Sequence, residues 1–322
     1  MPFYSVTAVL LLSLSANSYA GNLFDMLQRM SNADHDQNYH GVFILRELDK
    51  LSTLKVRHGN DEKGVWESLE TLDGESRKVI RRNNKVVSIF PERKLVTIRH
   101  RADNHSLHLQ LPENIDQLDL YYTIQRLDDD RIANHQTLVV DLLPKDQYRY
   151  GYRYWVDKTT GMLLRCDLLA VDKTVVEQMM FTSLEYSDSS PVQSFDIAQF
   201  EQYKQQILDE QEVSEHKDIQ LKWAVNALPK GFMLTQSTMR RSQPTTVDSN
   251  ADLLHMVYSD GLASVSIFIE QNQGEEKHLQ GTSTMGAVNA YGNPVGDYFV
   301  TVVGEVPVTT VQSMARSTVK LP

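Results

Sequence analysis

The stretch HMVYSDGLASVSIFIE, residues 255–270, decides how the downstream half of the chain folds. It begins with an apolar run, passes through Ser259-Asp260-Gly261, and continues with apolar side chains at every second position. An Asp-Gly pair supplies the positive φ that a tight hairpin turn requires, and a period of two is typical of a strand with one buried face. The stretch therefore predicts a β-hairpin. It carries no nucleophile, base or metal ligand in a reactive arrangement, so we interpret it as scaffold.

The sequence around this hairpin predicts a small β domain over residues 218–322. Its strands are expected at residues 222–224, 233–241, 253–258, 263–271, 281–291 and 297–304. Pro307 precedes a final helix with apolar side chains on one face, so we expect an antiparallel sheet with one helix across it. Upstream, residues 196–212 are polar, Gln-rich and compatible with a helix. We place the connector between two domains there, over residues 187–217.

The upstream half predicts a larger β domain over residues 21–186. Apolar residues at helical spacing between residues 23 and 30 indicate a short amphipathic helix, whose apolar face should cover a sheet. From residue 41 the pattern changes to strands separated by turn residues. We expect these strands at residues 42–48, 53–58, 65–72, 77–82, 85–90, 95–100, 136–143, 148–156, 162–169 and 175–186. Successive hairpins of this kind form an antiparallel meander.

Residues 1–20 have the features of a signal peptide, with an apolar run at residues 9–14 and the small-x-small cleavage sequence Ser18-Tyr19-Ala20. The mature chain is therefore expected to be exported. The remaining residues, about 300, are too many for one ordinary core, which predicts two domains. A single cysteine, Cys166, excludes an internal disulfide framework, and its apolar neighbours predict a buried, unreactive thiol.

The net charge of −10 argues against a nucleic acid as partner, because phosphate contacts need an excess of Lys and Arg. This charge is unevenly distributed. Residues 77–101 contain nine basic residues and one acidic residue, which gives +8 in this stretch and −18 in the rest of the chain. Two interpretations are open: a solvated sheet face whose charges protect strand edges, or a local site for an anion or an acidic peptide.

Four tyrosines, Tyr148, Tyr150, Tyr152 and Tyr154, occupy alternate positions of one expected strand and therefore share a face. Rings in this arrangement usually pack between a sheet and its cover. An aromatic face opposite a helix also suits an apolar cavity that binds a ligand.

The sequence offers no set of residues for catalysis or metal binding. His105 and His108 fall on opposite faces of an extended segment, and neither they nor His100 have a third ligand at a fitting distance in sequence. The acidic triplet at residues 128–130 lacks the spacing and turn glycine of a calcium loop. No nucleophile elbow, zinc-protease, phosphate-loop or dinucleotide-binding motif is present. We therefore expect no enzyme, no cofactor and no metal; an exported hydrolase would need residues that only folding brings together.

Two groups of motifs resemble one known family. The first is the strand-turn-strand segment YWVDKTTGMLLRCDLL, residues 154–169. The second combines Trp223 with LPKGF at residues 228–232, YSDGL at residues 258–262 and VVGEVP at residues 302–307. In this order the motifs resemble the RseB/MucB family of periplasmic negative regulators of the envelope-stress sigma factor, sigma-E. The similarity covers nearly the whole mature chain.

This resemblance implies a mainly β (α+β) fold. The first domain would be a half-open antiparallel β-barrel with covering helices, like the lipoprotein carriers LolA and LolB, and the second a smaller antiparallel β domain with a C-terminal helix. It implies a periplasmic protein that binds the periplasmic domain of a single-span, RseA/MucA-like anti-sigma factor and shields it from regulated proteolysis. Lipopolysaccharide or mislocalised lipoprotein would release it. A homo-oligomer is compatible with this function.

In the mechanism that the resemblance implies, a peptide partner and an acyl-chain ligand favour different arrangements of the two domains. The candidate lipid-binding residues are Tyr148, Tyr150, Tyr152, Tyr154, Arg81, Arg82 and Lys85, of which the basic ones would meet lipid phosphates. The candidate partner-binding residues are Trp223, Phe232 and Tyr258, which could equally form the core of the second domain. The alternative function is a periplasmic lipid or lipoprotein carrier of the LolA/LolB type, which would have no need of a second domain.

Overall fold

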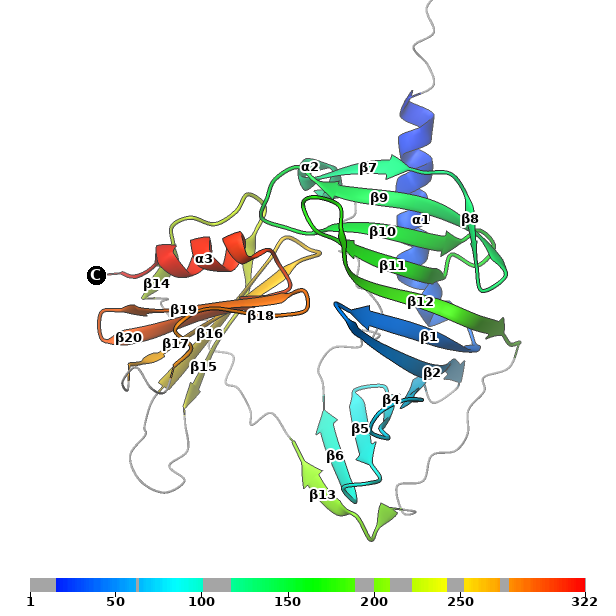
Figure 1. The fold of residues 1–322 in the computed structure, drawn as a ribbon, viewed down its shortest axis with the longest axis horizontal. Helices are drawn as coiled ribbons and strands as arrows, with labels where there is room; N and C mark the ends of the chain where they lie inside the picture. Colours follow the sequence, from blue (N-terminus) through cyan, green and yellow to red (C-terminus); the bar gives the residue numbers. More distant parts are fainter. Residues whose placement is uncertain are drawn as a thin grey trace, which may run out of the picture.

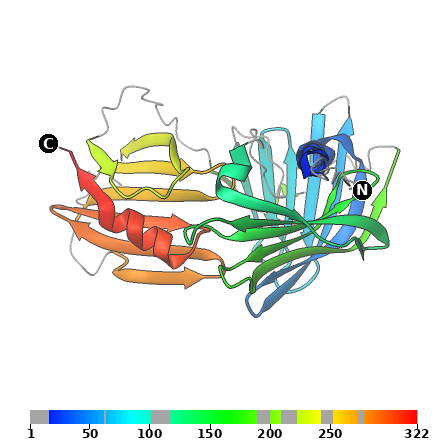
Figure 2. The same ribbon diagram turned by 90° about the horizontal axis from the view of Figure 1, so that it is seen from above.

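The computed structural model describes residues 16–61, 64–100, 117–188, 200–208, 222–241, 252–272 and 278–321. Two β domains lie side by side, and each has a sheet of its own (Figures 1 and 2). The mainly β class expected from the sequence is confirmed. Within the described residues, no helix is both long enough and apolar enough to cross a membrane.

The first domain is built on one thirteen-stranded sheet. Its strands are β1 (Tyr39–Glu47), β2 (Lys50–Asp61), β3 (Gly64–Thr71), β4 (Lys78–Arg82), β5 (Lys85–Phe90), β6 (Leu95–His100), β7 (Tyr122–Arg126), β8 (Asp130–Ile132), β9 (His135–Pro144), β10 (Gly151–Asp157), β11 (Leu163–Leu169), β12 (Val175–Tyr186) and β13 (Lys204–Ile207). Neighbours follow the order β13-β6-β5-β4-β3-β2-β1-β12-β11-β10-β9-β7, and β8 pairs with β9. The end strands β7 and β13 do not pair with each other among the described residues, so the curved sheet is half-open, as predicted.

Helix α1 (Ala16–Asp36) packs against one face of this sheet (Figure 2). Met26, Leu27 and Met30 are buried there in one core with Tyr152 and Tyr154. Burial of an apolar side chain of this size contributes about 1.5 to 3 kcal/mol, so these contacts hold the helix on the sheet. The amphipathic helix predicted near the start of the mature chain is confirmed. A second, short helix, α2 (Leu118–Tyr121), leads into β7.

The second domain is a six-stranded antiparallel sheet with a helix packed on it (Figure 1). Its elements are β14 (Trp223–Val225), β15 (Met233–Arg241), β16 (Asp252–Ser259), β17 (Ser264–Gln271), β18 (Gly281–Met285), β19 (Val288–Val295), β20 (Tyr298–Gly304), α3 (Val308–Ser317) and β21 (Thr318–Lys320). The sheet order is β15-β16-β17-β20-β19-β18, and β14 pairs with β21 beside it. The predicted hairpin is β16–β17, with Gly261 at φ +98° in its turn. Its buried Ile267 packs with Val311 and Met314 of α3 in one core.

The structure differs from the sequence-based expectations in three segments. Residues 281–291 were expected to form one strand but contain the β18–β19 hairpin, which turns at Gly286 with φ +62°. The strand expected from Tyr148 begins at Gly151, because the residues before it contact the second domain. The helix-compatible interpretation of residues 196–212 is wrong in the described part, residues 200–208, which forms a turn and then β13.

Candidate functional site at the contact between the two domains

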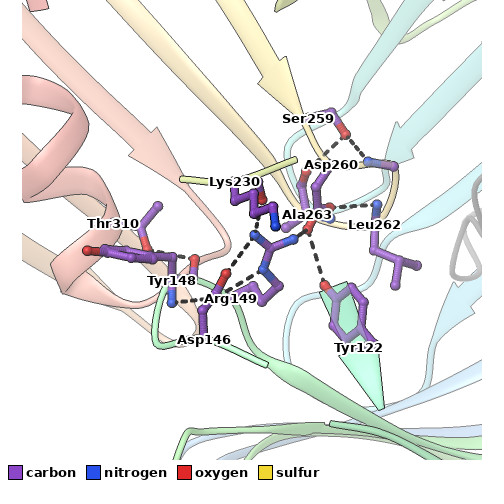
Figure 3. Close-up of polar contacts among 11 residues, drawn as sticks. Tyr122, Asp146, Tyr148, Arg149, Lys230, Ser259, Asp260, Leu262, Ala263 and Thr310 are labelled. Atoms are coloured by element: carbon purple, nitrogen blue, oxygen red, sulfur yellow. Dashed lines mark hydrogen bonds and ion pairs between the residues drawn. The ribbon is translucent and has the colours of Figure 1, made fainter. Parts of the chain in front are cut away.

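The contact between the domains is a polar site assembled from segments that are far apart in the sequence. The first domain contributes the β9–β10 loop together with residues of β7 and β12. The second domain contributes the β16–β17 turn, the loop before β15, the β18–β19 turn and the start of α3. Figure 3 shows the polar contacts that converge on Arg149.

Arg149, in the β9–β10 loop, is the centre of this site, and its side chain is completely buried. Its Nη1 donates a hydrogen bond to Asp260 of the second domain. Its Nη2 donates to Asp146 Oδ2 at 2.9 Å and to the backbone oxygen of Lys230 at 2.6 Å, and its Nε donates to Asp146 Oδ1 at 3.1 Å. Every guanidinium nitrogen therefore has a partner, and two of the four bonds cross to the second domain.

Asp260 uses its two carboxylate oxygens for different purposes. Oδ1 accepts hydrogen bonds from the backbone N–H groups of Leu262 and Ala263, at 2.9 and 2.8 Å, which closes the β16–β17 turn. Oδ2 faces the first domain and accepts from Arg149 and, at 3.4 Å, from the Tyr122 hydroxyl. The side chain has no exposed surface. The turn that we interpreted as scaffold is therefore also a contact between the domains.

Aromatic rings surround the Arg149 guanidinium. Its carbon lies 5.1 Å from the ring centre of Tyr121, 5.7 Å from that of Tyr122 and 5.2 Å from that of Phe232. A desolvated guanidinium over aromatic rings gains about 2 kcal/mol. Gly231 follows Lys230 with φ +94°, and a Cβ atom there would lie 2.6 Å from the Tyr121 ring. Glycine is thus required both for the backbone conformation and for the close approach of the ring.

The electrostatic environment shifts the pKa values of Arg149 and Tyr122. Burial acts to lower the pKa of Arg149, but the hydrogen bond to Asp146 and the negative charge of Asp260 outweigh it and raise this pKa. Burial and the charge of Asp260 also raise the pKa of the Tyr122 hydroxyl well above its usual value, so Tyr122 remains a donor. Removing one partner of a buried ion pair costs about 3 to 5 kcal/mol, because the other charge stays buried.

A second set of hydrogen bonds joins the β9–β10 loop, at Tyr150, and β12 to the β18–β19 turn. The Tyr150 hydroxyl donates to the backbone oxygen of Ala287 at 3.3 Å and accepts from Asn289 Nδ2 at 3.1 Å. Asn289 Nδ2 also donates to the backbone oxygen of Val306 at 2.8 Å. On β12, Glu177 Oε1 accepts from the backbone N–H of Ala287 at 2.9 Å. The turn is thus held by the β9–β10 loop and β12 of the first domain.

Glu305, just after β20, adds a titratable group to this region. Surrounding protein atoms hinder solvation of its carboxylate, and the negative charge of Glu177 acts in the same direction, which raises the pKa of Glu305 to about 7. The two carboxylates belong to different domains. Their repulsion therefore grows as Glu305 loses its proton.

The start of α3 rests on the same β9–β10 loop as Asp260. Thr310 Oγ1 donates to the backbone oxygen of Tyr148 at 2.7 Å, and Thr309 Oγ1 donates to that of Gln147 at 3.2 Å. Residues 146–150 of the first domain thus contact four separate segments of the second domain. A shift of this loop would change the contacts with all four.

The structure divides the four predicted tyrosines between two places. Tyr152 and Tyr154 are buried under α1 with their rings stacked 5.7 Å apart. Tyr150 is buried at the domain contact, and Tyr148 lies in the β9–β10 loop, half-buried, where Figure 3 shows it beside Thr310. They therefore form a continuous path from the α1-covered core to the domain contact rather than one ligand-facing row.

The structure does not bring the three predicted basic residues together. Arg81 is buried and its Nη2 lies 3.3 Å from Glu67 Oε2. Arg82 and Lys85 are paired across β4 and β5 on the opposite face of the sheet, where Arg82 donates to both oxygens of Asp61 at 2.6 and 2.9 Å. Lys85 is exposed. Two of the three positive charges are thus compensated by carboxylates.

Trp223, Phe232 and Tyr258 all lie in the buried core of the second domain. Trp223 packs edge-on against Tyr298, with ring centres 5.2 Å apart. Phe232 extends from this core to the guanidinium of Arg149. The three side chains therefore shape the domain from within, and one of them also reaches the domain contact.

The metal ligands and the thiol that the sequence analysis considered are the remaining candidate groups. Among the described residues there is no cluster of three or more His, Cys, Asp or Glu side chains that could hold a metal ion. His105 and His108 lie outside the described residues. Cys166 is buried, and burial raises the pKa of its thiol far above the usual value, so the thiol stays protonated. The arrangement around Arg149 is thus suited to holding two domains in one orientation.

Comparison with known proteins identifies similar chains across both domains. The family model of the MucB/RseB N-terminal domain matches residues 23–209, and that of the MucB/RseB C-terminal domain matches residues 217–319. The sigma factor AlgU regulatory protein MucB of Pseudomonas aeruginosa is 30% identical over 302 residues, which cover 92% of this chain and 91% of that protein. The sigma-E factor regulatory protein RseB of Haemophilus influenzae is 25% identical over 319 residues, which cover 98% and 97%.

Solved structures of similar proteins share the two-domain fold. The complex of MucA and MucB from Pseudomonas aeruginosa matches with a TM-score of 0.69 and 28% identity, covering 94% of this chain and 99% of that chain. A crystal structure of MucB with MucA(peri) matches with a TM-score of 0.67 and 28% identity, covering 92% and 98%.

Proposed function

Because this chain belongs to the MucB/RseB family, we propose that it regulates an envelope-stress sigma factor by binding the periplasmic segment of a membrane-anchored anti-sigma factor. The observation that carries the proposal is the match of both domains, in order, to sigma factor regulatory proteins. A relative, MucB, has been crystallised with MucA(peri). The signal peptide expected at residues 1–20 supports export of the mature chain to the periplasm, where that segment would be found.

In this proposal the bound chain shields the anti-sigma segment from proteolysis, and lipopolysaccharide or a mislocalised lipoprotein releases it. A ligand shifts an equilibrium only if it binds the two states with different affinity. In this proposal the contact around Arg149 is the element that changes: it is joined in the structure described, it separates in the other state, and the two ligands bias it in opposite directions. This supports regulation through the relative position of the domains.

The proposed lipid site lies between α1 and the sheet, beside Tyr152 and Tyr154. The Tyr154 hydroxyl is buried without a hydrogen-bond partner, and an unsatisfied buried hydroxyl costs about 1 to 3 kcal/mol. Met26 and Leu27 fill this space in the described state, so an acyl chain would enter by displacing α1. Among the basic residues, Arg82 and Lys85 share a sheet face and remain the candidates for lipid phosphate.

A binding assay on the purified mature chain tests the proposed function. Isothermal titration with the periplasmic segment of a MucA/RseA-type anti-sigma factor should give a one-to-one complex, and the complexed segment should resist the protease that cleaves it when free. Addition of lipopolysaccharide should reverse both effects. Absence of a complex, together with purification of the chain bound to free lipoprotein, would instead identify a carrier of the LolA/LolB type.

A further inference from the structure

Residues 200–208, between the two domains in sequence, dock on the first domain. Here β13 adds to the outer edge of β6, with Lys204 opposite Leu95 and Ile207 opposite Ile98. The pairing is parallel, whereas the other strand pairs among the described residues are antiparallel. The chain thus uses part of its own connector to cover a sheet edge that has no other partner strand among the residues that the structure describes.

Backbone hydrogen bonds fix both ends of this added strand. The N–H of Lys204 donates to the Lys94 oxygen at 2.8 Å, and the N–H of Leu208 donates to the Ile98 oxygen at 2.7 Å. Hydrogen bonding alternates along a strand, so the N–H of Gln205 points away from β6. Proline at position 204 therefore removes a hydrogen bond to the first domain, whereas proline at position 205 removes none.

Two aromatic side chains precede the strand and pack on an apolar surface of the first domain. The rings of Phe200 and Tyr203 meet edge-on with centres 5.2 Å apart. Both pack against a buried cluster on β3–β6, which we call the β3–β6 shelf; its residues are Trp66, Ile80, Val87, Ile89, Val96 and Ile98. The segment thus has two aromatic anchors three positions apart, followed directly by a strand.

The strand itself is weakly held. All four residues of β13 are exposed, including Ile207, which is 63% exposed. The strand is shorter than is usual, and its Lys-Gln-Gln sequence adds no apolar side chain to the shelf. Elements with few buried contacts open at low cost in free energy. Residues 200–208 are therefore suited to be displaced.

We propose that the β3–β6 shelf and the β6 edge form a peptide-binding groove that residues 200–208 occupy within the same chain. The ligand that takes their place is an extended peptide of a partner protein, with two aromatic or large apolar side chains three positions apart and a strand directly after them. This groove is separate from the Arg149 site, and the inference does not depend on the function proposed above.

The observations favour a partner peptide over a second copy of the chain. The resident segment is tethered, which gives it an effective concentration of about millimolar. A second copy offers the identical segment and gains no new contact. A partner whose strand carries β-branched apolar residues in place of Lys204–Gln206 pairs better with β6 and can therefore displace the tethered segment.

Peptide binding to chains with a loosened connector tests the proposal. The probe is a fluorescently labelled peptide of residues 199–208, QFEQYKQQIL, followed by anisotropy with the full mature chain. In the variant Phe200→Ser/Tyr203→Ser the tethered segment loses its anchors, so the peptide should bind at least about tenfold more tightly than to the unmodified chain. Lys204→Pro should have the same effect because it removes the bond to Lys94. Gln205→Pro, the matched control, should bind like the unmodified chain.

Three results would overturn this inference. The first is equal affinity for all four chains, and the second is equal binding of a peptide with serine at both aromatic positions. The third is dimerisation of the loosened variants in light scattering, which would assign the groove to a second copy. Circular dichroism checks folding; if Phe200→Ser/Tyr203→Ser is unfolded, the comparison of Lys204→Pro with Gln205→Pro decides alone.

Discussion

Replacing Asp260 with asparagine tests whether the ion pair with Arg149 holds the two domains together. Asparagine keeps an oxygen that can accept from Leu262 and Ala263, so the β16–β17 turn is preserved. It removes the negative charge that faces a completely buried guanidinium. Arg149 then retains one carboxylate partner, Asp146, on its own loop.

The size of the effect follows from this geometry. Loss of one partner of a buried ion pair costs about 3 to 5 kcal/mol, and because Asp146 remains we expect a value near the lower limit, about 3 kcal/mol. For domains of this size, 1 kcal/mol lowers the unfolding midpoint by about 2 to 4 °C, so Asp260→Asn should lower it by about 6 to 12 °C.

Urea unfolding followed by tryptophan fluorescence measures the free energy of unfolding in both domains. Trp66 and Trp155 report on the first domain and Trp223 on the second. The matched control is Asp172→Asn, because Asp172 also accepts bonds from a turn, at Thr174, but is exposed and lies in the β11–β12 turn. The control should change stability by less than about 0.5 kcal/mol. Equal losses in the two variants would refute a role for the ion pair in joining the domains.

Two further substitutions test other parts of the contact. The raised pKa of Glu305, about 7, means that the folded chain keeps a proton that the unfolded chain releases near its ordinary pKa of 4.5; the free energy of unfolding should therefore fall as pH rises from 5 to 8. Because Glu305 keeps contact with solvent, this fall in the free energy of unfolding should be smaller than the release of one full proton would give. Glu305→Gln should remove the pH dependence, which urea titrations at several pH values measure. Gly231→Ala should destabilise the chain by about 2 to 4 kcal/mol in urea unfolding, since it combines a positive φ with a clash against the Tyr121 ring. Gly74→Ala, at φ +67° with nothing within 4 Å, should lose only about 1 kcal/mol, and a loss as large as that of Gly231→Ala would contradict the proposed clash.

The elements that the sequence predicts well are those that depend on neighbouring residues. The hairpin at residues 255–270 and the antiparallel strands of the first domain follow from alternation and turn chemistry, which act over a few positions. Arg149 and Asp260 are 111 positions apart, and no local pattern indicates that they meet. Asp260 also had a complete local explanation as a turn residue, which concealed the second role of its carboxylate.

The connector and the basic stretch show two other limits of sequence patterns. Residues 204–207 become a strand because β6 offers an edge and the aromatic anchors hold the segment beside it, which is tertiary context that overrides local propensity. Composition counts Arg81 and Arg82 as one positive cluster. The strand period places them on opposite faces, and each meets a carboxylate of another strand, Glu67 of β3 or Asp61 of β2.

A polar domain contact has a consequence for regulation that an apolar one would not have. A buried, hydrogen-bonded ion pair is either formed or broken, so under the proposed regulation we expect two discrete arrangements of the domains rather than a sliding contact. A short run of chain, residues 149–154, joins the domain contact to the core under α1. It carries Arg149 and Tyr150 at the contact and Tyr154 beneath α1. We therefore expect a ligand that binds beneath α1 to disturb the contact directly.

This coupling must be reciprocal if the proposed regulation is correct. The free energy lost when the Arg149–Asp260 pair breaks, about 3 kcal/mol, is the upper limit of the coupling free energy between the two ligands. A typical coupling of 1 to 3 kcal/mol changes affinity by about 5- to 150-fold. Saturation with the anti-sigma segment should therefore weaken lipopolysaccharide binding by the same factor by which lipopolysaccharide weakens binding of the segment. In Asp260→Asn both factors should shrink together, because the element that separates the two states is already broken. Titration of each ligand in the presence of the other measures both factors, and coupling that survives unchanged in the variant would mean that the two sites communicate by another route.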